Sequence, residues 1–226
     1  MTEINGWIVI DKPKGMTSRA AVDEAAKWFP KKTAIGHTGT LDPLATGLLI
    51  VCTGKFTKII NEYMAQEKEY TGGFTLGAIT PTYDLESEPG NFKDINSITK
   101  EKILNATRQF IGEIMQAPPA HSAIKIDGKR VYELARQGKE VIIEPRKIFI
   151  KEFEITNIDM PVVSFRVVCG TGTYIRSLAN DFGKALGCGA YLSSLCRTRI
   201  GNSKLENAMT ITEWEDEIKK IKGLSV

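Results

Sequence analysis

The residue in this chain best suited to do chemistry is Asp42, a single carboxylate in a loop rich in glycine and hydroxyl side chains. The loop reads Gly36-His37-Thr38-Gly39-Thr40-Leu41-Asp42-Pro43-Leu44-Ala45-Thr46-Gly47. Its glycines permit backbone approaches that a side chain forbids, and Pro43 directs the residue before it towards an extended conformation. An aspartate with an ordinary pKa of about 3.9 is ionised at neutral pH and suits a nucleophile or a base. The alternative is a plain turn in which Asp42 bonds only its own backbone.

Several other chemistries lack the residues that they require. Zinc-dependent deamination needs a His/Cys ligand set and an H-x-E motif, and with only His37 and His121 we predict no metal site. The sequence contains no P-loop motif. A glycosidase brings two carboxylates to one bond, and Glu67 and Glu69 are weak partners for Asp42. The residues leave open a phosphate-handling enzyme, a base-modifying enzyme and a non-catalytic nucleic-acid binder.

A second candidate segment is Gly170-Thr171-Gly172-Thr173-Tyr174-Ile175-Arg176, which follows an apolar run and opens an amphipathic one. A dinucleotide-binding loop is rejected because Ile175 stands where the third glycine belongs and no acid follows about 20 residues later. The segment predicts a helix start whose N–H groups are available to an anion, with Arg176 in the first turn.

Aromatic and cationic residues complete the candidate set. Tyr70 begins a predicted strand, where it is either a half-buried sheet residue or an aromatic ring offered to a base. Five lysines precede the Asp42 loop and form either a solvated face or phosphate contacts: Lys12, Lys14, Lys27, Lys31 and Lys32. Residues 116–138 suggest a surface excursion with a short basic helix ended by Gly138, and such a helix could equally serve solubility alone.

Composition allows these functions without requiring one of them. The chain has 226 residues, 42% of them hydrophobic, and a net charge of +3, so a nucleic-acid partner is permitted. No linker, repeat, signal peptide or membrane span is visible, which predicts one cytoplasmic domain. The four cysteines form no C-x-x-C pair and are expected to be reduced, mostly buried thiols.

Periodicity predicts the elements that must position these residues. Expected strands cover residues 6–10, 48–52, 68–76, 162–169 and 191–201, with one or two more within 141–158. Expected helices cover 17–29, 55–64, 99–110, 175–186 and 210–220, the third of them buried through Ile103, Leu104 and Phe110. Residues 80–96 lack periodicity and are expected to form a mobile loop.

Six blocks, in order, resemble the bacterial tRNA pseudouridine-55 synthase family. Besides residues 36–47 they are Asp11 to Ser18, Lys68 to Tyr70, Pro118 to Lys125 with Tyr132 to Gly138, Gly172 to Leu178, and Leu195 to Thr198. The resemblance implies an α+β fold, with a bent, mixed, mostly antiparallel sheet flanked by helices and a central active-site cleft. It further implies a single domain with a thumb-like RNA-binding insertion at about 118–145. The chain resembles a short form without the additional C-terminal RNA-binding (PUA) domain of longer members.

The resemblance also implies an activity. A uridine of the tRNA T-arm, expected at position 55, would be isomerised to pseudouridine by a cytoplasmic monomer without a cofactor. Asp42 matches the essential aspartate, Arg176 the arginine that pairs with it, and Tyr70 the tyrosine stacked on the target base. Alternatives are an RNA-binding or tRNA-folding module with secondary catalysis, and the same reaction on another uridine.

The remaining site residues are expected to bind the substrate. By the same resemblance, Tyr174 and Leu195 line the pocket, and His37 fills the space left by the extruded nucleotide. Lys12 either supports the Asp42 loop or touches phosphate. The basic residues of the insertion are expected to carry much of the grip on RNA: Lys125, Lys129, Arg130 and Arg136.

Overall fold

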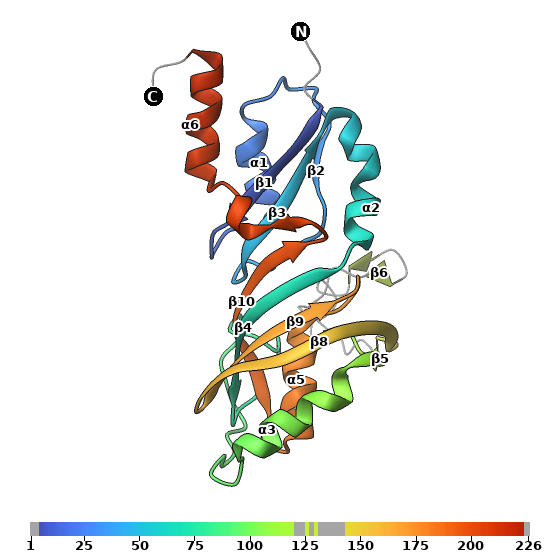
Figure 1. Cartoon of the computed structure of the whole chain (residues 1–226), viewed down its shortest axis with the longest axis vertical. Helices are drawn as coiled ribbons and strands as arrows, with labels where there is room; N and C mark the ends of the chain where they lie inside the picture. Colours follow the sequence, from blue (N-terminus) through green and yellow to red (C-terminus); the bar gives the residue numbers. More distant parts are fainter. Residues whose placement is uncertain (1–4, 120–124, 127–128, 131–142, 224–226) are drawn as a thin grey trace. The chain divides into compact units, whose positions relative to one another are not determined.

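The computed structural model describes residues 5–119, 125–126, 129–130 and 143–223. Within these residues the chain has an α+β fold, with a mixed, mostly antiparallel sheet and flanking helices. The chain divides into two compact units (Figure 1). We call residues 1–71 with 195–226 the terminal unit, and residues 72–194 the central unit. The expectation of a single domain stays a prediction.

The terminal unit contains the strands that flank the Asp42 loop. Its strand order is β1-β3-β10-β4, formed by β1 (Gly6–Lys12), β3 (Thr46–Thr53) and parts of β10 (Ala190–Ile200) and β4 (Lys68–Leu76). β1 and β3 are antiparallel, whereas β10 runs parallel to β3. Two short strands pair outside this order, β2 (Ile35–His37) with β3 and β11 (Ser203–Lys204) with β10.

Strand β3 is a continuous apolar run because both of its faces are covered. Leu49 and Val51 pack with the cluster that joins β1, α1 (Ser18–Ala26) and α6 (Ile211–Lys222). Leu48, Ile50 and Cys52 face the other cluster, which includes partly buried side chains of η1 (Gly54–Ile59) and α2 (Ile60–Ala65). The same unit holds the short η3 (Leu205–Asn207). Burial on both faces makes β3 a rigid support for the loop that precedes it.

Two helices of this unit are shorter than the periodicity predicts. α1 ends at Ala26, and Trp28 and Phe29 follow in a turn before Pro30. The segment 54–65 is a 3₁₀ helix followed by one short α-helix rather than one continuous α-helix. Thr17 caps α1 by accepting a hydrogen bond from the Ala20 N–H (3.0 Å).

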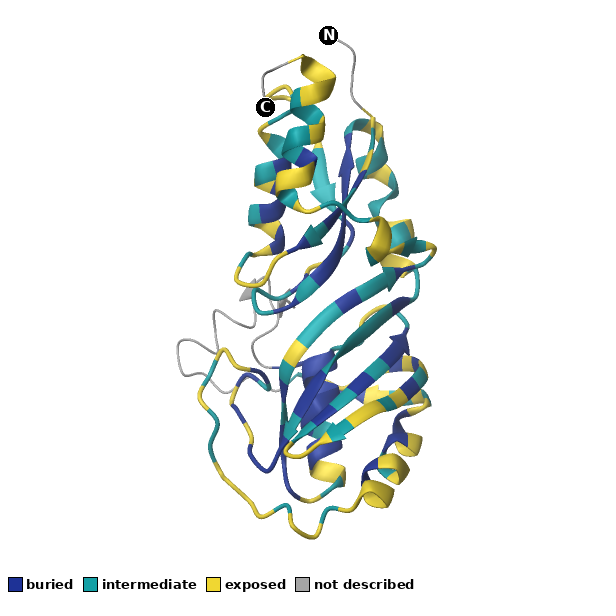
Figure 2. Ribbon diagram, turned by 60° about the vertical axis from the view of Figure 1, so that its left-hand side comes forward, coloured by how far each residue is buried: buried dark blue, intermediate teal, exposed yellow. Residues whose placement is uncertain are grey.

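The central unit surrounds a core of phenylalanines. Its strand order is β10-β4-β9-β8-β5, with β5 (Gly112–Gln116), β8 (Arg146–Asp159) and β9 (Val162–Cys169). Its helices are α3 (Lys100–Thr107), continued by η2 (Arg108–Phe110), and α5 (Ile175–Ala185). The Phe74 ring stacks on Phe165 at 4.2 Å between ring centroids, and both side chains are buried. Buried residues (dark blue in Figure 2) accordingly mark the strands of this unit and the inner face of α5.

Two expectations for the central unit are wrong. Leu104 was expected in the core but is 42% exposed, because the buried residues of α3 are Ile103 and Thr107. Residues 80–96 form a loop, as expected, in which Gly90 pairs with Ile79 and Thr82 and Asp84 are buried; its mobility stays a prediction. Gln116 is not on the surface, because it ends β5 with 2% exposure.

The insertion expected at 118–145 lies mostly outside the described residues. Its described part is a two-stranded ladder of β6 (Lys125–Ile126) and β7 (Lys129–Arg130), so the expected helix does not begin at 129. Cys52, Cys169 and Cys188 are buried, Cys196 is half-buried, and all four are free thiols. In the described part of the chain, none of the helices has the length and apolarity needed to cross a membrane.

Candidate active site

The Asp42 loop connects β2 to β3 and is fixed beside Asp42 by one buried hydroxyl. Ser18 Oγ donates a hydrogen bond to the Leu41 carbonyl (3.0 Å) and accepts one from the Leu41 N–H (2.8 Å). Ser18 is 2% exposed and opens α1, so these bonds form away from competing water. Two bonds to the main chain of one residue restrain the chain immediately before Asp42.

The second half of the loop meets other backbone segments. The Gly15 N–H donates to the Pro43 carbonyl (2.7 Å), which joins the loop to the segment after β1. Gly47 has a φ of 100°, and a β-carbon there would lie 2.4 Å from the Arg197 carbonyl oxygen. Only glycine permits that approach, so β10 packs directly against the point where the loop becomes β3.

Arg197 is a buried cation that bridges two carbonyls of this region. Its Nε donates to the Leu48 carbonyl (2.8 Å), and its Nη2 donates to the Gly39 carbonyl (3.1 Å). The side chain is 1% exposed. One planar guanidinium therefore ties the first part of the loop to the strand that follows it.

Lys12 ends β1 as a second buried cation. Its ammonium donates to the carbonyls of Pro13 (2.9 Å) and Met16 (2.6 Å), and the residue is fully buried. Burial lowers the pKa of Lys12, the negative charge of Asp42 opposes that shift, and the cation of Arg197 adds to it. Both bonds lie within the segment that follows β1, and the choice between support of the Asp42 loop and a contact with phosphate stays a prediction.

His37 stands at the start of the loop. Its Nδ1 accepts a hydrogen bond from the Gly39 N–H (3.3 Å). Burial, with the nearby cation of Arg197, lowers the pKa of His37 below its ordinary value. The surroundings of His37 therefore favour the uncharged form of its ring.

Tyr70 and Leu195 are half-buried on β4 and β10 of the terminal unit. The Thr46 hydroxyl donates to the Leu195 carbonyl (3.3 Å), so the strand end with Leu195 is joined to β3. The acids near Tyr70 have other partners in this unit. Arg199 pairs with Glu67 (2.6 Å), and the Thr198 hydroxyl donates to Glu69 Oε1 (2.8 Å). Both contacts weigh against either acid as a second catalytic carboxylate.

Arg176 lies in the first turn of α5, in the central unit, and is 5% exposed. Its Nε is 3.6 Å from Asp84 Oδ2, and its Nη1 donates to the Thr82 carbonyl (3.4 Å). Asp84 is 4% exposed, and sequence reasoning missed it. The only signal in the sequence was a lone acid in the hydroxyl-rich run Thr80 to Asp84. The pairing of Arg176 with Asp42 stays a prediction.

Tyr174 is the N-cap residue of α5 and is held through its main chain. The Gln116 side chain donates from Nε2 to the Tyr174 carbonyl (3.1 Å) and accepts at Oε1 from the Tyr174 N–H (2.8 Å). Sequence reasoning placed Gln116 on the surface and so missed this contact.

The basic residues expected to grip RNA are only partly described. Lys125, Lys129 and Arg130 lie on the β6–β7 ladder, and Arg136 lies outside the described residues. Among the residues that the structure describes, no group of three or more His, Cys, Asp or Glu side chains is placed to hold a metal ion.

Profiles of one protein family cover most of the chain. The TruB family pseudouridylate synthase (N terminal domain) matches residues 27–175. The tRNA pseudouridylate synthase B C-terminal domain matches residues 176–223. All the expected catalytic residues lie within these two matches.

Full-length relatives agree with the profiles. The tRNA pseudouridine synthase B of Flavobacterium johnsoniae is 52% identical over 218 residues, covering 94% of this chain and 95% of the relative. The enzyme of the same name from Bacteroides fragilis is 46% identical, covering 93% and 94%. Among solved structures, the chain matches a Cbf5-Nop10-Gar1 complex with a TM-score of 0.74 and 32% identity. That match covers 97% of this chain but only 57% of the matched chain.

Proposed function

Because the chain belongs to the TruB family of pseudouridylate synthases and is a tRNA pseudouridine synthase, we propose that its target is a T-arm uridine, position 55, with Asp42 as the catalytic carboxylate. In this reaction the N1–C1′ bond breaks, the base turns, and a C5–C1′ bond forms. C5 loses its proton and N1 gains one, so the isomerisation needs no oxidant, reductant or cofactor.

The observation that carries the proposal is the restraint of the Asp42 loop. Ser18 bonds both main-chain groups of Leu41, and Arg197 joins Gly39 to Leu48. A loop tied this closely holds one carboxylate at a fixed angle, which a nucleophile or base requires and a plain turn does not. The attraction between Asp42 and the buried ammonium of Lys12 favours the ionised carboxylate.

The other residues have roles that follow from their chemistry. A uridine stacked in the T-loop must be extruded before its C5 and C1′ can react. Tyr70 offers a half-buried ring for stacking on the extruded base, and the neutral ring of His37 occupies the vacated space. The family resemblance assigns Tyr174 and Leu195 to the lining of the pocket and Arg176 to pairing with Asp42.

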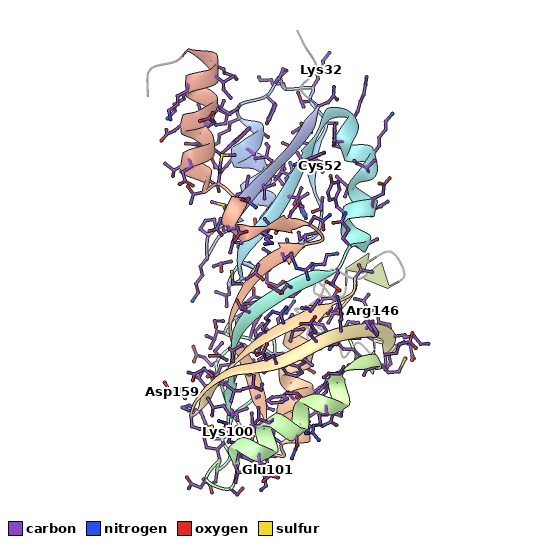
Figure 3. All side chains as sticks on the ribbon, viewed as in Figure 1. Lys32, Cys52, Lys100, Glu101, Arg146 and Asp159 are labelled. Carbon is purple, nitrogen blue, oxygen red and sulfur yellow. The ribbon has the colours of Figure 1, made fainter. Side chains whose placement is uncertain are left out.

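Tritium release from a T-arm stem-loop labelled at C5 of uridine tests the proposal. The wild type releases tritium, and Asp42→Ala releases none at RNA concentrations that give equal binding. The matched control is Asp159→Ala, at the exposed end of β8 (labelled in Figure 3), which retains wild-type release. Binding without release by the wild type would favour an RNA-binding module instead. Equal release by Asp42→Ala would contradict the role of Asp42.

We further propose that the basic residues of the insertion supply much of the affinity for tRNA. Each cation that contacts a phosphate displaces a counterion, so binding weakens as salt rises. Neutralising Lys125, Lys129, Arg130 and Arg136 together therefore reduces the salt dependence of tRNA binding. An unchanged salt slope would assign the affinity to other residues.

A further inference from the structure

The segment 172–177 of the central unit is held by side chains that the proposed reaction does not use. Gln116 bonds both main-chain groups of Tyr174 and is itself buried. A primary amide presents a donor and an acceptor side by side, so the pair of bonds fixes the orientation of the Tyr174 main chain as well as its position.

Helix α5 can begin at Tyr174 without the two hydrogen bonds from Gln116, so these bonds are an additional restraint. The Tyr174 carbonyl already accepts a hydrogen bond from the Leu178 N–H (3.1 Å), which is the first bond of α5. Gln116 therefore supplies a second donor to a carbonyl that already has a partner. The buried amide restrains the angle at which the chain enters α5, and thereby the direction in which the Tyr174 side chain leaves the backbone.

Arg146 acts on the same tyrosine from the neighbouring strand. Gln116 and Arg146 face each other in the β5–β8 ladder. The Arg146 guanidinium carbon lies 5.1 Å from the centroid of the Tyr174 ring, and the guanidinium also donates to the Gly172 carbonyl. Figure 3 labels Arg146 at the start of β8. One pair of facing residues thus holds the main chain and the ring of Tyr174.

A further hydrogen bond holds the first turn of α5. The Ser177 hydroxyl donates to the Ala117 carbonyl (2.7 Å), and Ser177 is 1% exposed. Arg176 therefore lies between two anchored neighbours, Tyr174 and Ser177. Residues at the end of β5 fix the backbone on both sides of this arginine.

We propose that Gln116 is a positioning residue for pseudouridine formation, which it serves by orienting Tyr174 and the turn that carries Arg176. Arg146 assists by holding the Tyr174 ring. The inference rests on the proposed function, because it takes Tyr174 and Arg176 to be residues of the reaction site.

The test is the single-turnover rate of tritium release from the C5-labelled T-arm stem-loop, with enzyme in saturating excess. Gln116→Met removes both bonds and keeps the size of the side chain. We expect its rate constant to fall about 10- to 100-fold, while the Kd for the stem-loop changes less than about 3-fold. The matched control is Gln109→Met, since Gln109 is exposed and bonds only the nearby Ala106 carbonyl.

Single-turnover kinetics separate a positioning role from a purely structural one. Partial unfolding lowers the fraction of RNA that reacts quickly, whereas misplacement of Tyr174 lowers the rate constant itself. A wild-type rate constant with reduced amplitude would therefore overturn the inference. If Gln116→Met does not fold, Arg146→Lys replaces it, because it keeps the charge and loses the planar group over the ring. Its expected loss is about 3- to 10-fold, and an unchanged rate constant would overturn the inference.

The outcomes also distinguish this inference from the proposed function. No tritium release by the wild type would overturn both. Release by the wild type and Gln109→Met, together with an unchanged rate constant for Gln116→Met, would overturn the positioning role alone.

Discussion

In the terminal unit, Ser18 bonds the N–H and the carbonyl of Leu41, next to Asp42, while in the central unit Gln116 bonds the same two groups of Tyr174, two residues before Arg176. The two segments differ in what the surrounding charges do. Around the Asp42 loop, the cations Lys12 and Arg197 donate to backbone carbonyls. In the other segment the acid Asp84 pairs with Arg176, which is an expected catalytic residue.

The difference shows two ways to keep a charged group in place away from water. Carbonyl oxygens bind a cation without neutralising it, so Lys12 and Arg197 leave positive charge near Asp42. A carboxylate neutralises its partner, so the charge of Arg176 is balanced locally. We therefore expect the stability of the segment around Arg176 to depend mainly on Asp84. The stability of the Asp42 loop should depend on several contacts that each contribute less.

Removing the Asp84 carboxylate should have the largest effect on the free energy of unfolding. Asp84→Ala removes the carboxylate that lies 3.6 Å from Nε of the buried Arg176 guanidinium, which should cost up to about 3–5 kcal/mol of unfolding free energy. Urea denaturation measures this loss, and Asp216→Ala is the control, because its pair with Lys219 is partly exposed and contributes less than about 1 kcal/mol.

A double substitution sharpens the same comparison. Asp84→Leu with Arg176→Met removes both charges, so it should recover most of the lost stability but none of the pseudouridine formation. If the double variant were as unstable as Asp84→Ala, charge balance would not be the reason for the loss.

Arg197→Met should have the next largest effect on the free energy of unfolding. It removes the charged donor from the carbonyls of Gly39 and Leu48, for an expected loss of about 2–4 kcal/mol together with slower tritium release. The neighbouring Arg199→Met is the matched control, since that side chain is 23% exposed and its pair with Glu67 contributes less than about 1 kcal/mol. Equal losses in the two variants would contradict a special role for the buried arginine.

Ser18→Ala should have a smaller effect on stability and a clear one on catalysis. It leaves the N–H and carbonyl of Leu41 without the Ser18 hydroxyl, at a cost of about 1–2 kcal/mol. The adjacent Thr17→Ala removes a helix cap at a similar cost of about 1 kcal/mol, but it does not touch the loop. Single-turnover rates should therefore fall in Ser18→Ala and stay at the wild-type value in Thr17→Ala. A fall of equal size in both would mean that helix α1, rather than the Leu41 contact, limits the rate.

Protonation of His37 should have the smallest effect on the free energy of unfolding. Its pKa is lower in the folded chain than in the unfolded chain, so the unfolded chain binds the proton more readily. Its contribution to stability is complete above the unfolded pKa of about 6.5 and is lost as pH falls through the lower, folded pKa. Urea unfolding at about pH 7.5 and 5.5 should show a smaller loss on acidification in His37→Gln than in the wild type. Identical losses would mean that His37 is not the group responsible.

The sequence determined the local elements and the position of the Asp42 loop. Apolar runs gave β3 and β9, the helical period gave α5, and the glycines and Pro43 marked the loop around Asp42. These features depend on the properties of residues close together in the chain, so a local pattern is sufficient to detect them. The family resemblance rested on the same local motifs, and the profiles and relatives confirm it.

Only the tertiary structure decided which side chains hold those segments. Arg197 bonds a carbonyl 158 residues away, and Arg176 bonds one 94 residues away. No period or motif records such a pairing, because it depends on how distant strands are ordered in the sheets. The burial of Ser18, Asp84 and Gln116 has the same origin, since a short polar residue in a turn or at a strand end has the same local signature whether it is buried or exposed. Their roles follow from the partners that folding gives them.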